Sequence, residues 1–160
     1  MSRKLVAYFS ASGTTAKIAE QLSEAIGADV HEIRPKTKYT DSDLNWRDSN
    51  SRSSVEMKNK KFRPEIADDK IDISQYDTIF VGFPIWWYVA PTIINTFFET
   101  HDFSKKKIVL FATSGGSGFG KTAEELKVSI PDGTKLIEGR ILNGNFANKE
   151  LSDWVDSLKV

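Results

Sequence analysis

Hydroxyl side chains gather in one short segment near the start of the chain. Residues 10–15 read Ser-Ala-Ser-Gly-Thr-Thr, between the pattern of a buried strand and that of an amphipathic helix. The start of such a helix offers free backbone N–H groups and the positive end of the helix dipole. This first loop is therefore suited to a phosphate monoester, with an ordinary helix cap as the alternative. The candidate binding residues are Ser10, Ser12, Gly13, Thr14 and Thr15.

A second loop, residues 83–89, is aromatic and reads Phe-Pro-Ile-Trp-Trp-Tyr-Val. Three adjacent aromatic side chains after a central strand are costly to leave half exposed without a use. A flat heteroaromatic ring could stack on one of them, while we expect at least one to pack in the core or in a subunit contact. The candidates are Pro84, Ile85, Trp86, Trp87 and Tyr88.

A third loop, residues 113–120, reads Thr-Ser-Gly-Gly-Ser-Gly-Phe-Gly. Its four glycines allow close approach of the backbone to a ligand. Successive N–H groups could then face carbonyl or anionic atoms of a bound ring. The candidates are Thr113, Ser114, Gly115, Gly116 and Gly118.

The elements between these loops alternate between strand and helix patterns. Apolar runs predict strands at 5–9, 29–33, 78–83, 108–112 and 136–142, the last broken by Gly139. Helical patterns end at Gly27, begin at Pro91, begin with the capping-box form Thr122–Glu125, and close the chain over 151–158. The alternation predicts a three-layer, doubly wound α/β fold, with a five-stranded parallel sheet of order 2-1-3-4-5. Ligands of such sheets bind at the carboxyl ends of the strands, where all three loops would meet.

The segment at about 35–70 departs from this alternation. It is rich in Ser, Asp, Lys and Asn, and we interpret it as an irregular insertion in a single domain of residues 1–160. Trp46 and Phe62 favour an insertion that packs down on the domain. Trp46 could also cover a bound ring.

The three loops, in this order, resemble those of the flavodoxin-like proteins, in particular a small bacterial branch. The resemblance spans nearly the whole chain, including Asp-Leu-Asn-Trp at 43–46. It implies a cofactor, FMN, whose phosphate is bound by the first loop and whose ring is flanked by the other two. It also implies an electron-transfer protein that works with redox partner proteins or small electron acceptors. The alternative is an NAD(P)H-dependent FMN oxidoreductase acting on quinones or other small acceptors. No catalytic side chain and no metal ligand is expected, because the flavin carries the chemistry.

Two departures from typical flavodoxins favour two-electron, hydride-type chemistry. Typical members are strongly acidic, whereas this chain has 22 basic and 22 acidic residues. Many have a glycine beside the aromatic residue of the second loop that lets a peptide flip toward the flavin. Here no glycine lies between Pro84 and Val89.

The amino-acid composition excludes several other classes of protein and of functional site. The chain has no cysteine, which excludes disulfides, thiolate catalysis and Cys-ligated metal sites. The balanced charge gives no reason to expect a nucleic-acid or membrane partner. The first apolar run is too short for a signal peptide, so we expect a cytoplasmic protein. The sequence leaves the oligomeric state open.

One rival motif overlaps the third loop. Residues 115–122 match G-x-x-x-x-G-K-[ST] after a strand and before a helix, as in a P-loop nucleotide-binding protein. In that interpretation Lys121 would contact phosphates and Thr122 would contact Mg²⁺. However, no apolar strand ends in the Asp that would hold the metal, and only 38 residues follow the match.

Overall fold

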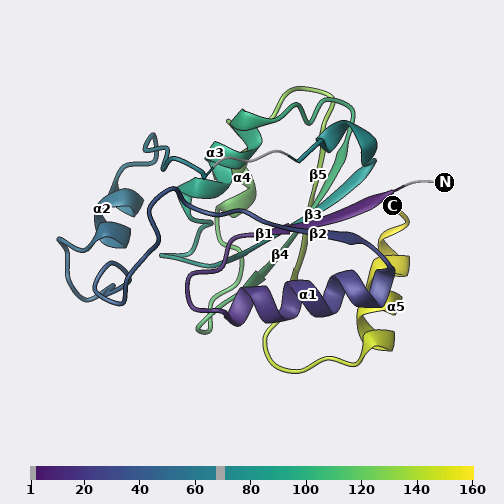
Figure 1. The fold of residues 1–160 in the computed structure, drawn as a ribbon, viewed down its shortest axis with the longest axis horizontal. Helices are drawn as coiled ribbons and strands as arrows, with labels where there is room; N and C mark the ends of the chain where they lie inside the picture. Colours follow the sequence, from purple (N-terminus) through teal and green to yellow (C-terminus); the bar gives the residue numbers. More distant parts are fainter. Residues whose placement is uncertain (1–2, 68–70) are drawn as a thin grey trace.

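Five parallel strands form the sheet at the centre of the molecule, in the order β2-β1-β3-β4-β5 (Figure 1). The strands are β1 (Lys4–Tyr8), β2 (Asp29–Glu32), β3 (Thr78–Pro84), β4 (Lys107–Thr113) and β5 (Lys135–Ile141). The computed structural model describes residues 3–67 and 71–160. Both the strand order and the parallel pairing agree with the prediction from the sequence.

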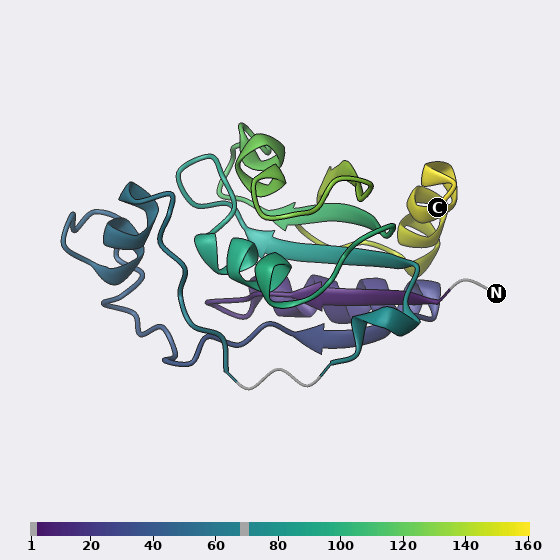
Figure 2. The same cartoon turned by 90° about the horizontal axis from the view of Figure 1, so that it is seen from above.

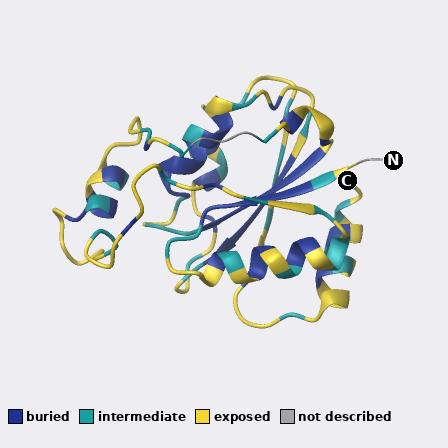
Figure 3. Cartoon of the chain, viewed as in Figure 1, coloured by how far each residue is buried: buried dark blue, intermediate teal, exposed yellow. Residues whose placement is uncertain are grey.

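Helices cover both faces of this sheet. The helices α1 (Thr14–Ile26) and α5 (Asn148–Leu158) lie on one face, and α3 (Thr92–Thr100) and α4 (Thr122–Lys127) lie on the other (Figure 1). Alternate residues of β1 divide between the two layers: Leu5 packs in the α3 layer, while Val6 packs in the α1 layer. The strands β3 and β4 are buried on both faces, which explains why they are apolar almost throughout (Figure 3).

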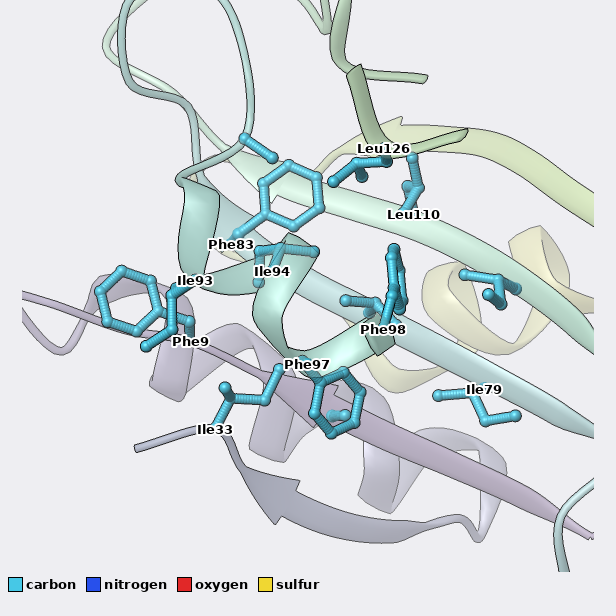
Figure 4. Packing of buried hydrophobic residues seen from close by; sticks show 14 of the residues in the cluster. Phe9, Ile33, Ile79, Phe83, Ile93, Ile94, Phe97, Phe98, Leu110 and Leu126 are labelled. Carbon is cyan, nitrogen blue, oxygen red and sulfur yellow. The ribbon is translucent and has the colours of Figure 1, made fainter. Parts of the chain in front are cut away.

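Phenylalanine rings fill the layer between the sheet and α3 (Figure 4). The rings of Phe97 and Phe98 meet Phe103 edge to face, with centroids 5.5 and 5.2 Å apart. All three side chains are at most 1% exposed. Since edge-to-face pairs add to the free energy gained by burial, these contacts hold the C-terminal half of α3 against the segment that leads into β4.

Two local predictions were wrong. Gly139 does not break β5: Leu110 pairs with Glu138 and Phe111 with Arg140, so a bulge at Gly139 keeps the strand continuous. Thr122 does not cap α4, because the helix begins at Thr122 itself and Lys121 precedes it without a side-chain cap.

The insertion is closed at its base and contains a short helix that the sequence did not predict. Pro35 and Ile66 form an isolated antiparallel bridge, and α2 (Arg52–Lys58) lies inside the resulting loop. A single 3₁₀ turn, Ile73–Gln75, leads into β3. Residues 68–70 of the predicted insertion lie outside the described residues. Two ion pairs join the insertion to the α3–α4 layer, Lys60–Glu125 at 2.6 Å and Arg63–Glu99 at 2.9 Å.

The insertion packs through different residues than expected. The sequence predicted an insertion that packs down on the domain and pointed to Trp46 and Phe62, but these two side chains are 65% and 39% exposed. Instead Tyr39 is buried, and its ring meets Phe9 and Trp86 edge to face at 5.6 and 5.5 Å. The ring of a residue in the insertion therefore contacts both the first strand–loop junction and the second loop.

A buried polar cluster holds Tyr39 in place. Its hydroxyl donates a hydrogen bond to the buried carboxylate of Glu56, which also accepts one from Arg52 at 2.9 Å. The Arg52 guanidinium lies 3.8 Å from the centre of the Tyr39 ring and donates to the Thr37 carbonyl. Burial, followed by the hydrogen bond to Glu56, raises the pKa of Tyr39 well above its ordinary value.

Candidate functional site

The three loops converge at the carboxyl edge of the sheet. Figure 2 shows all the strands pointing toward the same end of the molecule, beyond which the insertion projects. The first, second and third loops follow β1, β3 and β4, which are neighbours in the sheet. The site predicted from the strand order thus lies between β1 and β3, where the chain reverses its winding direction.

The first loop closes on itself and leaves the start of α1 open. The Gly13 N–H donates to Ser10 Oγ at 3.0 Å, and Gly13 precedes α1 with a left-handed φ of 93°. A glycine adopts this conformation without the steric cost that a side chain would add. No side chain caps the helix, so the N–H groups of its first turn point out of the loop without a side-chain partner.

A hollow of about 460 Å³, here called the hydroxyl hollow, lies at this helix start. Ser12, Gly13 and Thr14, three of the candidate phosphate-binding residues, line it, and the Ser12 and Thr14 hydroxyls are exposed. Lys17, one turn into α1, adds a positive charge that the sequence reasoning missed. The other lining residues that it missed include Gln21, Gly144 and Asn145. Helical spacing from Thr14 to Lys17 was the available signal for the lysine.

Thr15 and Thr113, both among the predicted binding residues, hydrogen-bond to each other through their side chains. Their hydroxyl oxygens lie 2.8 Å apart and share a hydrogen bond, and the two residues are 2% and 5% exposed. The pair therefore joins the first loop to the third loop. Spacing along the sequence could not reveal this, because 98 positions separate the two residues.

The three aromatic residues of the second loop differ in burial: one packs against the core and two are exposed. Trp86 is half-buried and contacts Phe9 edge to face at 5.7 Å. Trp87 and Tyr88 are 44% and 69% exposed. Reciprocal backbone hydrogen bonds of 2.9 and 3.1 Å between Trp86 and Val89 force the turn between them. The sequence expectation that at least one of the three is structural is therefore met by Trp86.

This turn holds two aromatic residues in a strained conformation. Trp87 and Tyr88 have φ values of 49° and 67°, which cost a residue with a side chain roughly 1–2 kcal/mol each. Gly120 of the third loop packs against the turn: its φ is 55°, and a Cβ there would lie 2.3 Å from the Tyr88 carbonyl oxygen. Strain of this kind is concentrated at functional sites, where surrounding contacts maintain it.

A hollow of about 600 Å³, here called the aromatic hollow, opens between the second and third loops. Ile85, Trp86, Trp87 and Tyr88 line one side, and Gly115, Gly116 and Ser117 line the other. Trp46 of the insertion also lines this hollow, next to the second loop. No Asp, Glu, His or Lys is among the lining residues. Pro84, by contrast, is the last residue of β3 and does not line this hollow.

Ser114 organises the third loop. Its Oγ accepts hydrogen bonds from the N–H groups of Gly116 and Ser117, at 3.2 and 2.8 Å. In this structure, therefore, these two N–H groups are paired within the loop. Asn143, after β5, clamps Ser114 with two reciprocal hydrogen bonds of 2.9 Å, and the sequence carried no signal for it. Gly118 is exposed but does not line the aromatic hollow.

The geometry of residues 115–122 does not fit a P-loop. Thr122, the residue that would contact Mg²⁺, is fully buried, and its hydroxyl donates to the Phe119 carbonyl. The following helix α4 has only six residues. Across residues 3–67 and 71–160, no group of three or more His, Asp or Glu side chains could hold a metal ion. None of the described helices is long and apolar enough to cross a membrane.

Together the two hollows offer different chemistry along one edge of the sheet. The hydroxyl hollow suits an anion, because it combines hydroxyls, helix N–H groups and Lys17. The aromatic hollow suits a flat ring, because it combines exposed indole faces with glycine backbone. A ligand carrying a phosphate and a planar aromatic ring matches this pair of surfaces.

Comparisons with known proteins agree with this fold. The family model described as Flavodoxin matches residues 3–158. A crystal structure of a candidate flavoprotein from Bacteroides eggerthii is 49% identical, with a TM-score of 0.91 over 100% of this chain and 99% of that one. One from Bacteroides uniformis is 46% identical, with a TM-score of 0.89 over 97% and 98% of the two chains. A flavoprotein from Lactobacillus acidophilus, solved in complex with FMN, is 24% identical and has the same fold, with a TM-score of 0.72 over 97% and 99%. None of the curated proteins matches the chain.

Proposed function

The chain belongs to the flavodoxin family, and from this premise we propose that it binds FMN non-covalently and transfers electrons through it. The observation that carries the proposal is that an anion-binding hollow and an aromatic hollow both lie at the carboxyl edge of the sheet, at loops that follow neighbouring strands. The FMN bound by the Lactobacillus acidophilus flavoprotein is consistent with this cofactor.

The hydroxyl hollow fits the phosphate of FMN. Ser12 and Thr14 present exposed hydroxyls, and the first N–H groups of α1 have no side-chain cap. Lys17 supplies a full positive charge beside them. A phosphate dianion satisfies these donors together, which is why helix starts of this type bind phosphate groups.

The aromatic hollow fits the isoalloxazine ring. Its walls are indole and phenol rings on one side and glycine backbone on the other, so a flat ring is bound mainly by stacking and burial. The Thr15–Thr113 hydrogen bond and the contact between Gly120 and Tyr88 join the loops that form these walls. The chain thereby holds the ring in one orientation before any partner arrives.

FMN, when bound, supplies one- and two-electron transfer chemistry, and the protein controls how the ring is held and what reaches it. No carboxylate, imidazole or amine lines the aromatic hollow, so the chain provides no side-chain acid or base there except the phenol of Tyr88. The role of the lining residues is to bind the ring, orient it and exclude water from one side.

Titration of the purified protein with FMN tests the proposal. We expect a stoichiometric visible flavin band, with quenching of the flavin fluorescence by Trp87 or Trp46. Riboflavin, which lacks the phosphate, should bind more weakly because it makes no contact in the hydroxyl hollow. A protein that takes up no FMN under these conditions contradicts the proposal.

A second function, an NAD(P)H-dependent oxidoreductase, is favoured by one observation. Trp46 and Trp87, which line the aromatic hollow, are 65% and 44% exposed, so a small reactant can reach the ring face. Anaerobic addition of NADH or NADPH to the FMN-loaded protein separates the two functions. Loss of the visible band identifies the oxidoreductase, whereas reduction only by dithionite or a reductase protein identifies the electron carrier.

A further inference from the structure

A third hollow, distinct from the hydroxyl hollow, adjoins the aromatic hollow on the side of the insertion. Here called the basic hollow, it has a volume of about 280 Å³ and is lined by Trp46, Arg47, Met57, Lys58 and Trp87, with two serines. Trp46 and Trp87 also line the aromatic hollow, so the two spaces share these indole rings as a common wall. A ligand in the basic hollow therefore lies directly beside whatever occupies the aromatic hollow.

The charge of this hollow is positive and not neutralised by neighbours. Among the described residues, neither Arg47 nor Lys58 has a carboxylate within ion-pair distance. Lys58 Nζ instead donates to the Ser49 carbonyl at 3.1 Å, and the Arg47 guanidinium lies 5.1 Å from the centre of the Trp46 ring. Residues 36–65 as a whole hold eight lysines and arginines against five acidic residues, although the complete chain is neutral. The excess positive charge of the insertion thus includes the two residues that line the hollow.

The aromatic wall is maintained at a cost. Trp87 keeps a left-handed backbone and Trp46 remains mostly exposed, although both side chains are among the largest apolar ones in the chain. An exposed pair of indoles beside two unpaired cations is suited to a ligand that is both flat and anionic. A purely apolar ligand would leave both cations without a counter-charge.

The size of the hollow limits the ligand further. Pockets for drug-sized ligands begin at about 300 Å³, so 280 Å³ accommodates one or two fused rings but not a dinucleotide. We infer that the basic hollow is a second-ligand subsite for small planar aromatic anions, the class that includes anionic quinones and carboxylated or sulfonated azo compounds. The inference rests on the proposed function, since it names the small molecules that would be held beside the flavin.

Binding of a redox-inert probe tests the inference without any turnover. We would titrate the protein, with and without FMN, with 2-naphthalenesulfonate and with the uncharged 2-naphthalenemethanol, following tryptophan fluorescence and heat. The anion should bind at least several-fold more tightly than its neutral analogue, and the preference should weaken as salt screens the cations. Equal affinity for the two probes, or no saturable binding of the anion, overturns the inference.

Variants locate the subsite. Arg47→Gln and Lys58→Gln should each weaken anion binding about 2- to 5-fold, as expected for single exposed charges, and Trp46→Ala should weaken it by up to about 10-fold. Lys61→Gln is the matched control, because Lys61 is an exposed lysine of the same segment that lines neither hollow. If Lys61→Gln weakens binding of the anionic probe as much as Lys58→Gln does, the probe responds only to the overall charge of the insertion. That result overturns the inference of a subsite. Normal FMN uptake with no probe binding refutes this inference alone, whereas no FMN uptake refutes the proposed function and with it the acceptor role.

Discussion

The buried hydroxyl of Tyr39 provides a stability prediction whose size depends on pH. Tyr39→Phe removes the donor that satisfies the buried Glu56 carboxylate while keeping the ring packed on Phe9 and Trp86. A hydrogen bond to a charged group contributes about 1.5–3 kcal/mol, so the variant should lose that much of the free energy of unfolding at neutral pH. For a chain of this length the loss corresponds to a melting temperature lower by about 3–12 °C.

The loss of unfolding free energy caused by Tyr39→Phe should become smaller at high pH. The pKa of a tyrosine in the unfolded chain is about 10, whereas burial and the hydrogen bond to Glu56 raise the pKa of Tyr39 in the folded protein. The stabilisation is therefore fully present below about pH 10 and is lost as the pH rises further, because the unfolded state releases the proton first. At about pH 11, ionisation of Tyr39 in the unfolded state lowers the free energy of unfolding of the wild type by about 1.4 kcal/mol. The Tyr39→Phe variant has no such group, so its deficit relative to the wild type becomes smaller by this amount.

Urea unfolding of both proteins at neutral pH and at pH 11 measures these quantities. Tyr76→Phe is the matched control, because its hydroxyl donates at 2.7 Å to Asp29, whose side chain is 54% exposed and can be hydrated instead. The control should therefore lose only about 0.5–1 kcal/mol at neutral pH. Equal losses for the two variants, or a loss for Tyr39→Phe that is the same at both pH values, would refute the assignment of a buried, charge-accepting partner.

Three further variants test the site. Tyr88→Gly should raise the melting temperature by about 2–4 °C, because relief of a left-handed φ gains about 1 kcal/mol; calorimetry showing a lower value would mean that the turn is not strained. Thr15→Val should cost about 1–3 kcal/mol in urea unfolding by leaving the Thr113 hydroxyl unpaired, and combining it with Thr113→Val should cost less than the sum; additive losses would contradict a shared hydrogen bond. Lys17→Gln should weaken FMN binding about 2- to 5-fold in a fluorescence titration and leave riboflavin binding unchanged; an equal effect on both ligands would remove Lys17 from the phosphate site.

The fold could be predicted from the sequence because its signals are local and repeat along the chain. The apolar runs of β3 and β4 identify strands buried on both faces, and the intervening Ile93–Phe98 stripe identifies a covering helix. Alternating elements of this kind have few arrangements that keep crossovers right-handed, and the doubly wound order 2-1-3-4-5 is one of them. The helix α2 was missed because its seven residues span only two turns and carry no apolar stripe.

The division between sequence and tertiary structure is clearest in the loops. The sequence by itself determined that hydroxyls, aromatics and glycines follow three strands whose carboxyl ends share one edge, because strands that alternate with helices run parallel. Only the tertiary structure decided how each side chain is used: Thr15 pairs with Thr113, Trp86 packs inward, and Trp87 is held outward by its turn. It also decided that Trp46 returns to the site from the insertion. These outcomes depend on contacts between residues distant in the chain, for which neither periodicity nor spacing carries a signal.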